Sequence, residues 1–227
     1  KARRPGRRAC IQMLLDAKAD INAKDQNGNT ALIRSVLGPS TACARMLLDA
    51  KADIEANNDN THTALMRAAM LERTENMQML LDARANIEAK DSQGQTALIL
   101  ASVTGCLQSM QLLIDAKAYI NAVDRHGYTA LSRAARYQRA ACLQVLVDAK
   151  ADLTTVTNDG YTALMLASCT RQTDCVNVLL SAFLAHETSL SPCLGERNDA
   201  ASKSQGERTN VKRRGSPQES PSKREKR

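Results

Sequence analysis

The chain has 227 residues, of which 43% are hydrophobic and only 2% are aromatic, with no tryptophan and a single phenylalanine. Its formal net charge is +7, and the first nine residues carry five Lys or Arg and no acid. The longest apolar stretch, residues 176–185, is far shorter than the roughly 18 residues of a membrane-spanning helix, so we expect no membrane span.

One seven-residue pattern recurs at a constant interval of 33 residues. LLDAKAD begins at Leu14 and at Leu47, and the variants LLDARAN, LIDAKAY and LVDAKAD begin at Leu80, Leu113 and Leu146. A strict period of 20 to 50 residues is typical of repeat proteins, in which each unit packs only against its neighbours. The sequence therefore predicts a stacked array and not a domain with one central core.

The array is expected to begin with a partial unit. We place an N-terminal half repeat at residues 1–24, because Gly6 holds the position of the turn between the two helices of a complete unit. The complete units that follow span residues 25–57, 58–90, 91–123, 124–156 and 157–186. We assign residues 187–227 to a separate basic tail.

Each complete unit is predicted to contain two helices joined by a turn. The second helix has apolar residues at spacing i, i+3, i+4, as in Met77, Leu80 and Leu81, with polar residues on its other side. The first helix starts after a threonine whose hydroxyl can accept a hydrogen bond from an unpaired N–H of the first turn. These threonines are Thr30, Thr63, Thr96, Thr129 and Thr162.

An extended segment with a tight turn is predicted between one unit and the next. Gly28, Gly94, Gly127 and Gly160 stand where such a turn commonly needs a positive φ. Thr61 stands at the same position in the remaining unit, so we expect its hairpin to be the weakest of the five. Each unit is thus a helix, a turn, a helix and a projecting hairpin.

The pattern D-x-x-G-x-T-A-L, a helix of small residues and then L-L-D-A-K-A-D-I-N-A resembles the ankyrin repeat, over roughly residues 1–186. The resemblance implies an all-α fold, an ankyrin-type α-solenoid of helix-turn-helix units with projecting β-hairpin loops. In that family a glycine in the left-handed conformation usually ends the second helix. Here that position is basic except in the last unit, where Phe183 replaces it. We expect the same left-handed conformation at Lys18, Lys51, Arg84, Lys117 and Lys150.

The sequence carries no pattern that indicates catalysis. It lacks a glycine-rich phosphate loop, a Gly-x-Ser-x-Gly turn and a His-Glu-x-x-His helix, and its three histidines lie in different units. Its seven cysteines include no C-x-x-C pair. Four cysteines share one repeat position with Asn76 and Ser109, which indicates a small packing position. We therefore expect no enzyme activity, no catalytic residue, no cofactor and no metal site. Because cysteines without a disulfide pattern are typical of intracellular proteins, we also expect a cytoplasmic or nuclear location.

The tail at residues 187–227 differs in composition from the repeats. It has ten Lys or Arg against six Asp or Glu and few apolar residues, so it is predicted to be disordered. Basic clusters begin at Lys212 and Lys223. They are consistent with a nuclear-import signal or a nucleic-acid contact, and equally with a tail that only adds solubility.

The expected partner-binding surface follows from the resemblance, which implies contacts through hairpin tips and the exposed end of each first helix. Three of the four tyrosines fall at such positions in the last two units, together with arginines, and both residue types are enriched at interface hot spots. The predicted site residues are Arg125, His126, Tyr128, Arg136, Tyr137 and Tyr161. An alternative is that Tyr128 and Tyr161 only brace their hairpins.

The sequence thus favours a monomeric module that binds a partner protein with an acidic surface. Two other functions stay open. The chain could act as a nuclear or nucleic-acid-associated factor through its basic tail, or it could be the regulatory ankyrin segment of a larger enzyme.

Overall fold

The computed structural model describes residues 6–169 and 173–189. The chain divides into two units, Lys1–Glu187 and Thr188–Arg227, and the repeats lie in the first. The tail predicted at residues 187–227 lies outside the described residues except for the end of one helix.

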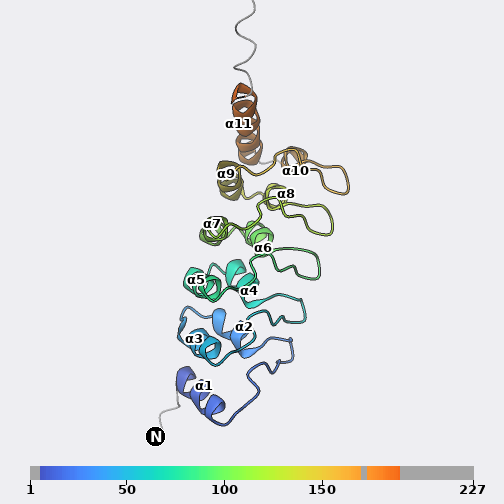
Figure 1. Ribbon diagram of the computed structural model, residues 1–227. Helices are drawn as coiled ribbons and strands as arrows, with labels where there is room; N and C mark the ends of the chain where they lie inside the picture. Colours follow the sequence, from blue (N-terminus) through green and yellow to red (C-terminus); the bar gives the residue numbers. More distant parts are fainter. Residues whose placement is uncertain (1–5, 170–172, 190–227) are drawn as a thin grey trace, which may run out of the picture. The chain divides into compact units, whose positions relative to one another are not determined.

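The described residues form eleven α-helices without a sheet, as predicted (Figure 1). The half repeat contributes α1 (Arg7–Asp16). The first helices of the complete units are α2 (Ala31–Val36), α4 (Ala64–Met70), α6 (Ala97–Thr104), α8 (Ala130–Arg136) and α10 (Ala163–Cys169). The second helices are α3 (Ala42–Asp49), α5 (Thr74–Asp82), α7 (Leu107–Asp115), α9 (Ala140–Asp148) and α11 (Thr173–Ser189). The all-α solenoid expected from the sequence is confirmed.

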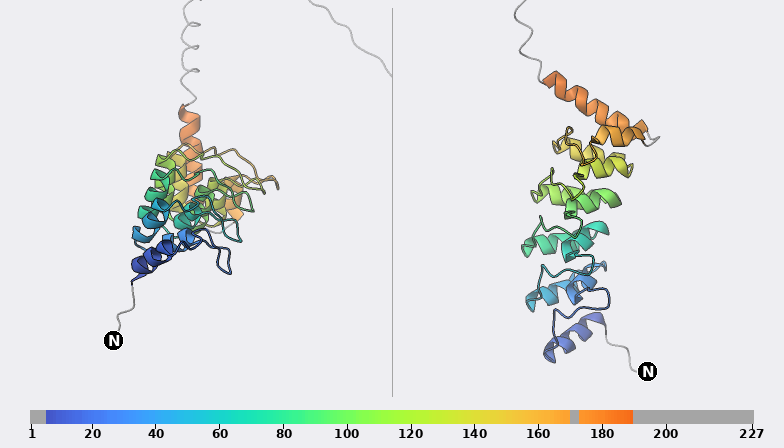
Figure 2. Two further views of the ribbon diagram at one scale, coloured as in Figure 1. Left: turned by 60° about the horizontal axis from the view of Figure 1, so that its bottom comes forward. Right: turned by 90° about the vertical axis from the view of Figure 1, so that its right-hand side faces the viewer.

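The helices of the repeats lie in two rows. Each first helix packs on the first helix of the next unit, and the second helices form a parallel row beside them. The hairpins project from the side of the first helices, and Figure 2 shows the helix pairs following one another as successive layers. The hairpins and the first helices thus share one side of the stack.

The threonine at the start of each first helix acts as predicted. The hydroxyl of Thr63 accepts from the N–H of Met66 at 3.4 Å, and the hydroxyl of Thr129 accepts from the N–H of Ser132 at 3.2 Å. In the second case the Ser132 hydroxyl also accepts from the N–H of Thr129 at 2.8 Å, which completes a capping box. Every complete unit therefore begins its first helix at the same repeat position.

The basic residue after α1, α3, α5, α7 and α9 has the expected left-handed conformation, with φ of 53° at Lys18 and 64° to 67° at the four later positions. The N–H of Lys51 donates to the carbonyl of Leu48, and the N–H of Ala52 donates to the carbonyl of Leu47, both at 2.9 Å. These two bonds form a Schellman motif, which satisfies carbonyls that the helix end leaves unpaired. LLDAKAD recurs because the half repeat and the first four complete units end their second helices in this way.

The hairpin tips of neighbouring units are joined through their backbones. The N–H of Arg125 donates to the carbonyl of Gln93 at 2.9 Å, and equivalent bonds join other tips. Thr61 takes the positive φ of the glycines, at 60°, and its hydroxyl accepts from the N–H of Ser92. The turn geometry is therefore kept without glycine, while the lower stability expected for this hairpin stays a prediction.

A second polar row joins the units, and the sequence did not reveal it. Side-chain oxygens of Asn22, Glu55, Glu88 and Asn121 each accept from a backbone N–H that lies 31 residues later, at 2.7 to 2.9 Å. These bonds cross from one unit to the next, so they fix the spacing of the extended segments.

The shared cysteine position lies inside the stack in the later units. Asn76, Ser109, Cys142 and Cys175 are buried there, and Asn76 donates to the carbonyl of Gly38 in the preceding unit at 2.9 Å. Burial raises the pKa of the Cys142 thiol to about 11. This position therefore packs small, uncharged side chains between units.

Candidate functional site

The six predicted site residues lie on hairpins and at the end of one first helix. Arg125 and His126 are exposed at the hairpin tip of residues 124–156, and Arg136 and Tyr137 are exposed where α8 ends. Tyr161 is 45% exposed in the following hairpin. The sixth, Tyr128, is buried at 4% exposure. Of the six, the structure brings the side chains of Tyr128 and Arg136 into direct contact.

Asp124 anchors this region, although the sequence did not single it out. Its Oδ1 accepts from the backbone N–H groups of His126 at 2.9 Å and Tyr128 at 3.0 Å. Its Oδ2 accepts from Nε of Arg133 at 2.9 Å and forms an ion pair with the Nη2 of the same guanidinium. One buried carboxylate thus ties the hairpin turn to the first helix of its unit.

Tyr128 contacts two arginines of α8. The Arg133 guanidinium carbon lies 4.2 Å from the centre of the tyrosine ring, within the range of a cation–π contact. Nη1 of Arg136 donates to the Tyr128 hydroxyl oxygen at 2.6 Å, and its guanidinium carbon lies 5.5 Å from the ring centre. This arrangement matches the alternative in which Tyr128 braces its hairpin, and a contact between Tyr128 and a partner stays a prediction.

Tyr161 holds the same repeat position in the next unit but lacks these neighbours. Thr157, Leu166 and Cys169 stand where the preceding unit has Asp124, Arg133 and Arg136. The Tyr161 side chain accordingly stays exposed, while its backbone N–H donates to the Thr157 hydroxyl at 3.1 Å. A comparison of the units at these positions could have separated the two tyrosines from sequence alone.

Residues 58–90 carry a different polar group at the same positions. His62 holds the place of Tyr128, and its Nε2 lies 3.4 Å from Oδ2 of Asp91 in the next unit. Burial lowers the pKa of His62, the Asp91 carboxylate opposes this, and Arg67 lowers the pKa further. Within the described part of the chain, Nδ1 of His62 and Nε of Arg67 are buried without a hydrogen-bond partner. The polar contact here joins two units and leaves two nitrogens unsatisfied.

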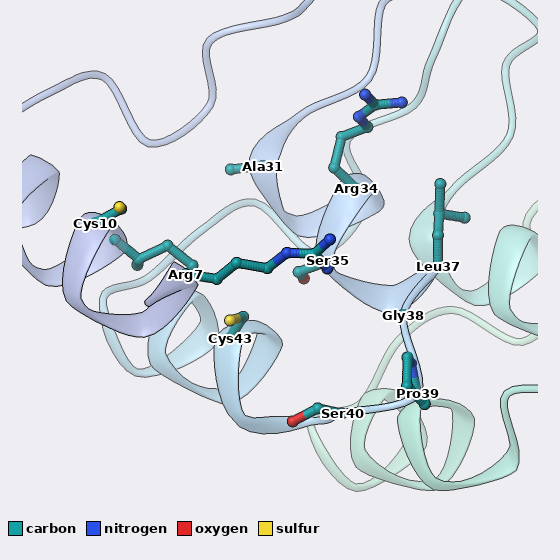
Figure 3. A pocket seen from close by; sticks show the side chains of 11 residues that line it. Arg7, Cys10, Ala31, Arg34, Ser35, Leu37, Gly38, Pro39, Ser40 and Cys43 are labelled. Atoms are coloured by element: carbon teal, nitrogen blue, oxygen red, sulfur yellow. The ribbon is translucent and has the colours of Figure 1, made fainter. Parts of the chain in front are cut away.

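A cavity of about 790 Å³ lies between α1, α2 and α3 (Figure 3). Arg7 extends from α1 toward Ser35, and the thiols of Cys10 and Cys43 lie near it. Ala31, at its wall, is exposed, whereas the equivalent Ala64 is fully buried because the preceding first helix covers it. The cavity is therefore a position in the stack that a first helix fills elsewhere, and its lining shows no set of catalytic groups.

Two kinds of site are not found in the part of the chain that the structure describes. No group of three or more His, Cys, Asp or Glu side chains is placed to hold a metal ion. No helix in the same ranges is long and apolar enough to cross a membrane.

Comparison with known families agrees with the repeat geometry. The family model for ankyrin repeats (three copies) matches the chain in four overlapping segments, residues 2–91, 55–124, 85–157 and 120–189. No curated protein matches the chain.

Proposed function

The chain belongs to the ankyrin repeat family, and from that premise we propose that it binds a partner protein on its concave, hairpin-bearing surface, chiefly through residues 124–156. Ankyrin repeats are generally protein–protein interaction modules, and the family is typically not enzymatic. The proposed contact residues are Arg125, His126, Arg136, Tyr137 and Tyr161, with Tyr128 as their buried support.

The free charge of two arginines supports this proposal most strongly. Among the described residues, ion pairs join Asp25 to Arg34 and Asp124 to Arg133, and His62 lies beside Asp91 in a contact that is an ion pair only when His62 is protonated. Arg125 and Arg136 are exposed and belong to none of these pairs. The positive charge of these two arginines is therefore not compensated by an ion pair. Such a charge attracts an acidic partner surface at long range and fixes the partner's orientation on contact.

Exposed aromatic side chains occur in the same unit as these arginines and in the next one. Tyr137 and Tyr161 are each 45% exposed, and neither is needed to fill the core of the stack. Tyrosine supplies a large contact area at a low cost in side-chain entropy. The combination of free arginines and exposed tyrosines occurs in the last two complete units, so we place the binding surface there.

Charge reversal tests this proposal. The protein is used to capture its partner, and the partner's affinity is then measured for Arg125→Glu, Arg136→Glu and Arg45→Glu. Arg45 is an exposed arginine of α3, at the repeat position that Gln78 and Gln144 hold on the outer side of the other second helices. The first two variants should bind more weakly, while Arg45→Glu should bind like the unchanged protein. Equal affinities for all three variants would place the binding surface elsewhere.

The basic tail supports a second candidate function, a nuclear or nucleic-acid-associated role. This candidate depends on the ten Lys or Arg of residues 187–227, all of which lie outside the described residues. Binding to phosphates weakens steeply with added salt, because each contact releases counterions. A steep salt dependence that disappears when residues 190–227 are removed would favour the tail over the repeats. Action within a larger enzyme, the monomeric state and a cytoplasmic or nuclear location stay predictions.

A further inference from the structure

We propose that the hydroxyl of Tyr128 and the guanidinium of Arg136 together form a binding site for one side-chain carboxylate, an Asp or Glu of the partner. This inference depends on the proposed function, since it assigns a ligand chemistry to part of the same surface. The Tyr128 hydroxyl has two parts in this site, since it holds Arg136 in place and donates its own proton to the ligand, while the exposed Arg136 supplies the positive charge.

The hydrogen-bond donors of the two groups are not used up by their contact. In the bond between them, Arg136 is the donor and the Tyr128 oxygen is the acceptor, at 2.6 Å. A tyrosine hydroxyl that accepts one bond still has its own proton to donate, and a guanidinium has five N–H groups, of which this bond uses one. The described residues provide no acceptor for the Tyr128 proton. The pair therefore offers donors of two kinds to an anion placed beside it.

The charge of the pair fits a carboxylate. Arg133 also lies at the Tyr128 ring, but Asp124 offsets its charge in an ion pair. Arg136 has no carboxylate within ion-pair distance among the described residues. The site thus has one uncompensated positive charge, which matches a carboxylate and falls short of a phosphate carrying nearly two negative charges.

The geometry is set before any ligand binds. The backbone of Tyr128 is bonded to Asp124, its ring is packed against Arg133, and its hydroxyl holds one Nη of Arg136. A free arginine side chain loses considerable rotamer entropy when it is immobilised, so a guanidinium that is already held binds an anion at a lower entropic cost.

The complete set of residues occurs in this unit alone. The other complete units lack at least one of Asp124, Tyr128, Arg133 and Arg136 at the equivalent positions. Tyr161, for example, has the same repeat position as Tyr128 but no arginine at either helix position. Tyr161→Phe is therefore a matched control for Tyr128→Phe, which removes the hydroxyl and keeps the ring.

The test is a titration of the full chain, labelled with ¹⁵N-arginine, with a hexaglutamate peptide at low salt. Because the basic tail also attracts this peptide, affinity is read from the side-chain N–H resonances of Arg136, which are identified by their loss in Arg136→Lys. The Arg133 resonances in the same spectra report that the cluster stays folded. Tyr128→Phe should weaken the affinity read at Arg136 by about tenfold, the usual effect of one hydrogen bond to a charged group. Tyr161→Phe should leave the affinity unchanged.

Three results would overturn the inference. The first is a Tyr128→Phe affinity equal to that of the unchanged protein. The second is a wild-type titration in which the peptide shifts other arginines but leaves Arg136 unaffected, a result that needs no variant. The third is tighter binding at Arg136 of a phosphoserine peptide with the same net charge, which would make phosphate the ligand.

This test is independent of the test of the proposed function. If Arg136→Glu lowers partner affinity while Tyr128→Phe leaves peptide affinity unchanged, the carboxylate site is wrong and the binding surface stands. If the peptide binds as expected but Arg125→Glu and Arg136→Glu keep full partner affinity, the binding surface is wrong.

Discussion

The units at residues 58–90 and 124–156 use the same repeat positions for different purposes. In residues 124–156 the buried Asp124 pairs with Arg133 of its own first helix. In residues 58–90 that carboxylate is replaced by Asn58, and His62 contacts Asp91 of the following unit instead. One unit is therefore braced within itself, and the other is joined to its neighbour.

The difference shows that the ankyrin backbone does not decide where polar contacts form. Both hairpins have the same turn and both first helices begin with the same threonine cap. Asp124 pairs with Arg133 in unit 124–156, and Arg136 of the same helix has no carboxylate within ion-pair distance among the described residues. Arg67 has no such carboxylate in its own unit, and its Nε stays buried without a partner among the described residues. We therefore expect unit 124–156 to bind a partner, and we expect the contact between unit 58–90 and the next unit to depend on pH.

The largest effect is expected from the loss of the internal brace. Arg133→Ala leaves the Asp124 carboxylate buried without its cation, and breaking one side of a buried ion pair typically costs about 3 to 5 kcal/mol. Urea unfolding should show this loss in the free energy of unfolding.

Arg34→Ala provides the control for that measurement. Arg34 occupies the same repeat position and pairs with Asp25, but its side chain is 61% exposed and the pair is 3.5 Å apart. Exposed pairs contribute little, so this variant should unfold almost like the unchanged protein. Equal losses in the two variants would show that burial does not distinguish the two pairs.

The apolar layer beneath the two hairpins should respond equally in both units. Leu65 and Leu131 hold the same repeat position, and each is 1% exposed. Truncation to alanine should cost about 2 to 5 kcal/mol at either site, because each leaves a cavity in a close-packed stack. A difference of more than about 1.5 kcal/mol between the two unfolding free energies would mean that the units differ in their cores as well.

Stability should depend on pH through His62. Its pKa is lowered by burial, so the unfolded chain binds more protons than the folded one between the folded pKa and the ordinary value near 6.5. The contribution of neutral His62 is therefore present above that ordinary value and is lost as the pH falls below it. Unfolding at roughly pH 5.5 and pH 7.5 should show a smaller difference in His62→Gln than in the unchanged protein. The same difference in both proteins would exclude His62 as the source.

The smallest effect is expected where the two units are alike. Arg84 and Lys150 both have a φ of 64° after their second helices. Replacement by glycine relieves left-handed strain of roughly 1 kcal/mol, partly offset by the greater freedom of glycine in the unfolded chain. Arg84→Gly and Lys150→Gly should each raise the melting temperature slightly or leave it unchanged. A marked fall in either would show that the side chain at that position stabilises the fold.

The features that repeat could be predicted from the sequence, and the features that do not repeat could not. The period of 33 located the helices. Thr63 acts as the pattern indicated and recurs in every complete unit, and Lys51 does so as well, with a basic residue at its position in the first four complete units. The contact of His62 with Asp91 does not recur at the equivalent positions of the other described units, so the period of 33 gives no sign of it. Tyr128 has a surface position in the repeat register, but it is 4% exposed because its ring packs against Arg133 and Arg136 of α8.

One signal for that cluster was present in the sequence. Asp25 and Arg34 are nine residues apart, as are Asp124 and Arg133, and both pairs form ion pairs. The spacing indicates the pair, but the burial that makes the second one strong depends on the side chain of Tyr128 above it. The sequence spacing therefore identifies possible ion pairs, but it does not show which of them is buried.

The central claim, that residues 124–156 form the binding surface, is tested most directly by cross-linking to the captured partner. Leu71 and Tyr137 hold the same repeat position at the ends of α4 and α8, so they allow a matched comparison of two units. Both side chains are exposed, at 42% and 45%, so a photoreactive benzoylphenylalanine can replace either one with little strain on the fold. If residues 124–156 form the binding surface, irradiation should join the partner to position 137 and give little product at position 71. Equal or stronger cross-linking from position 71 would contradict the account.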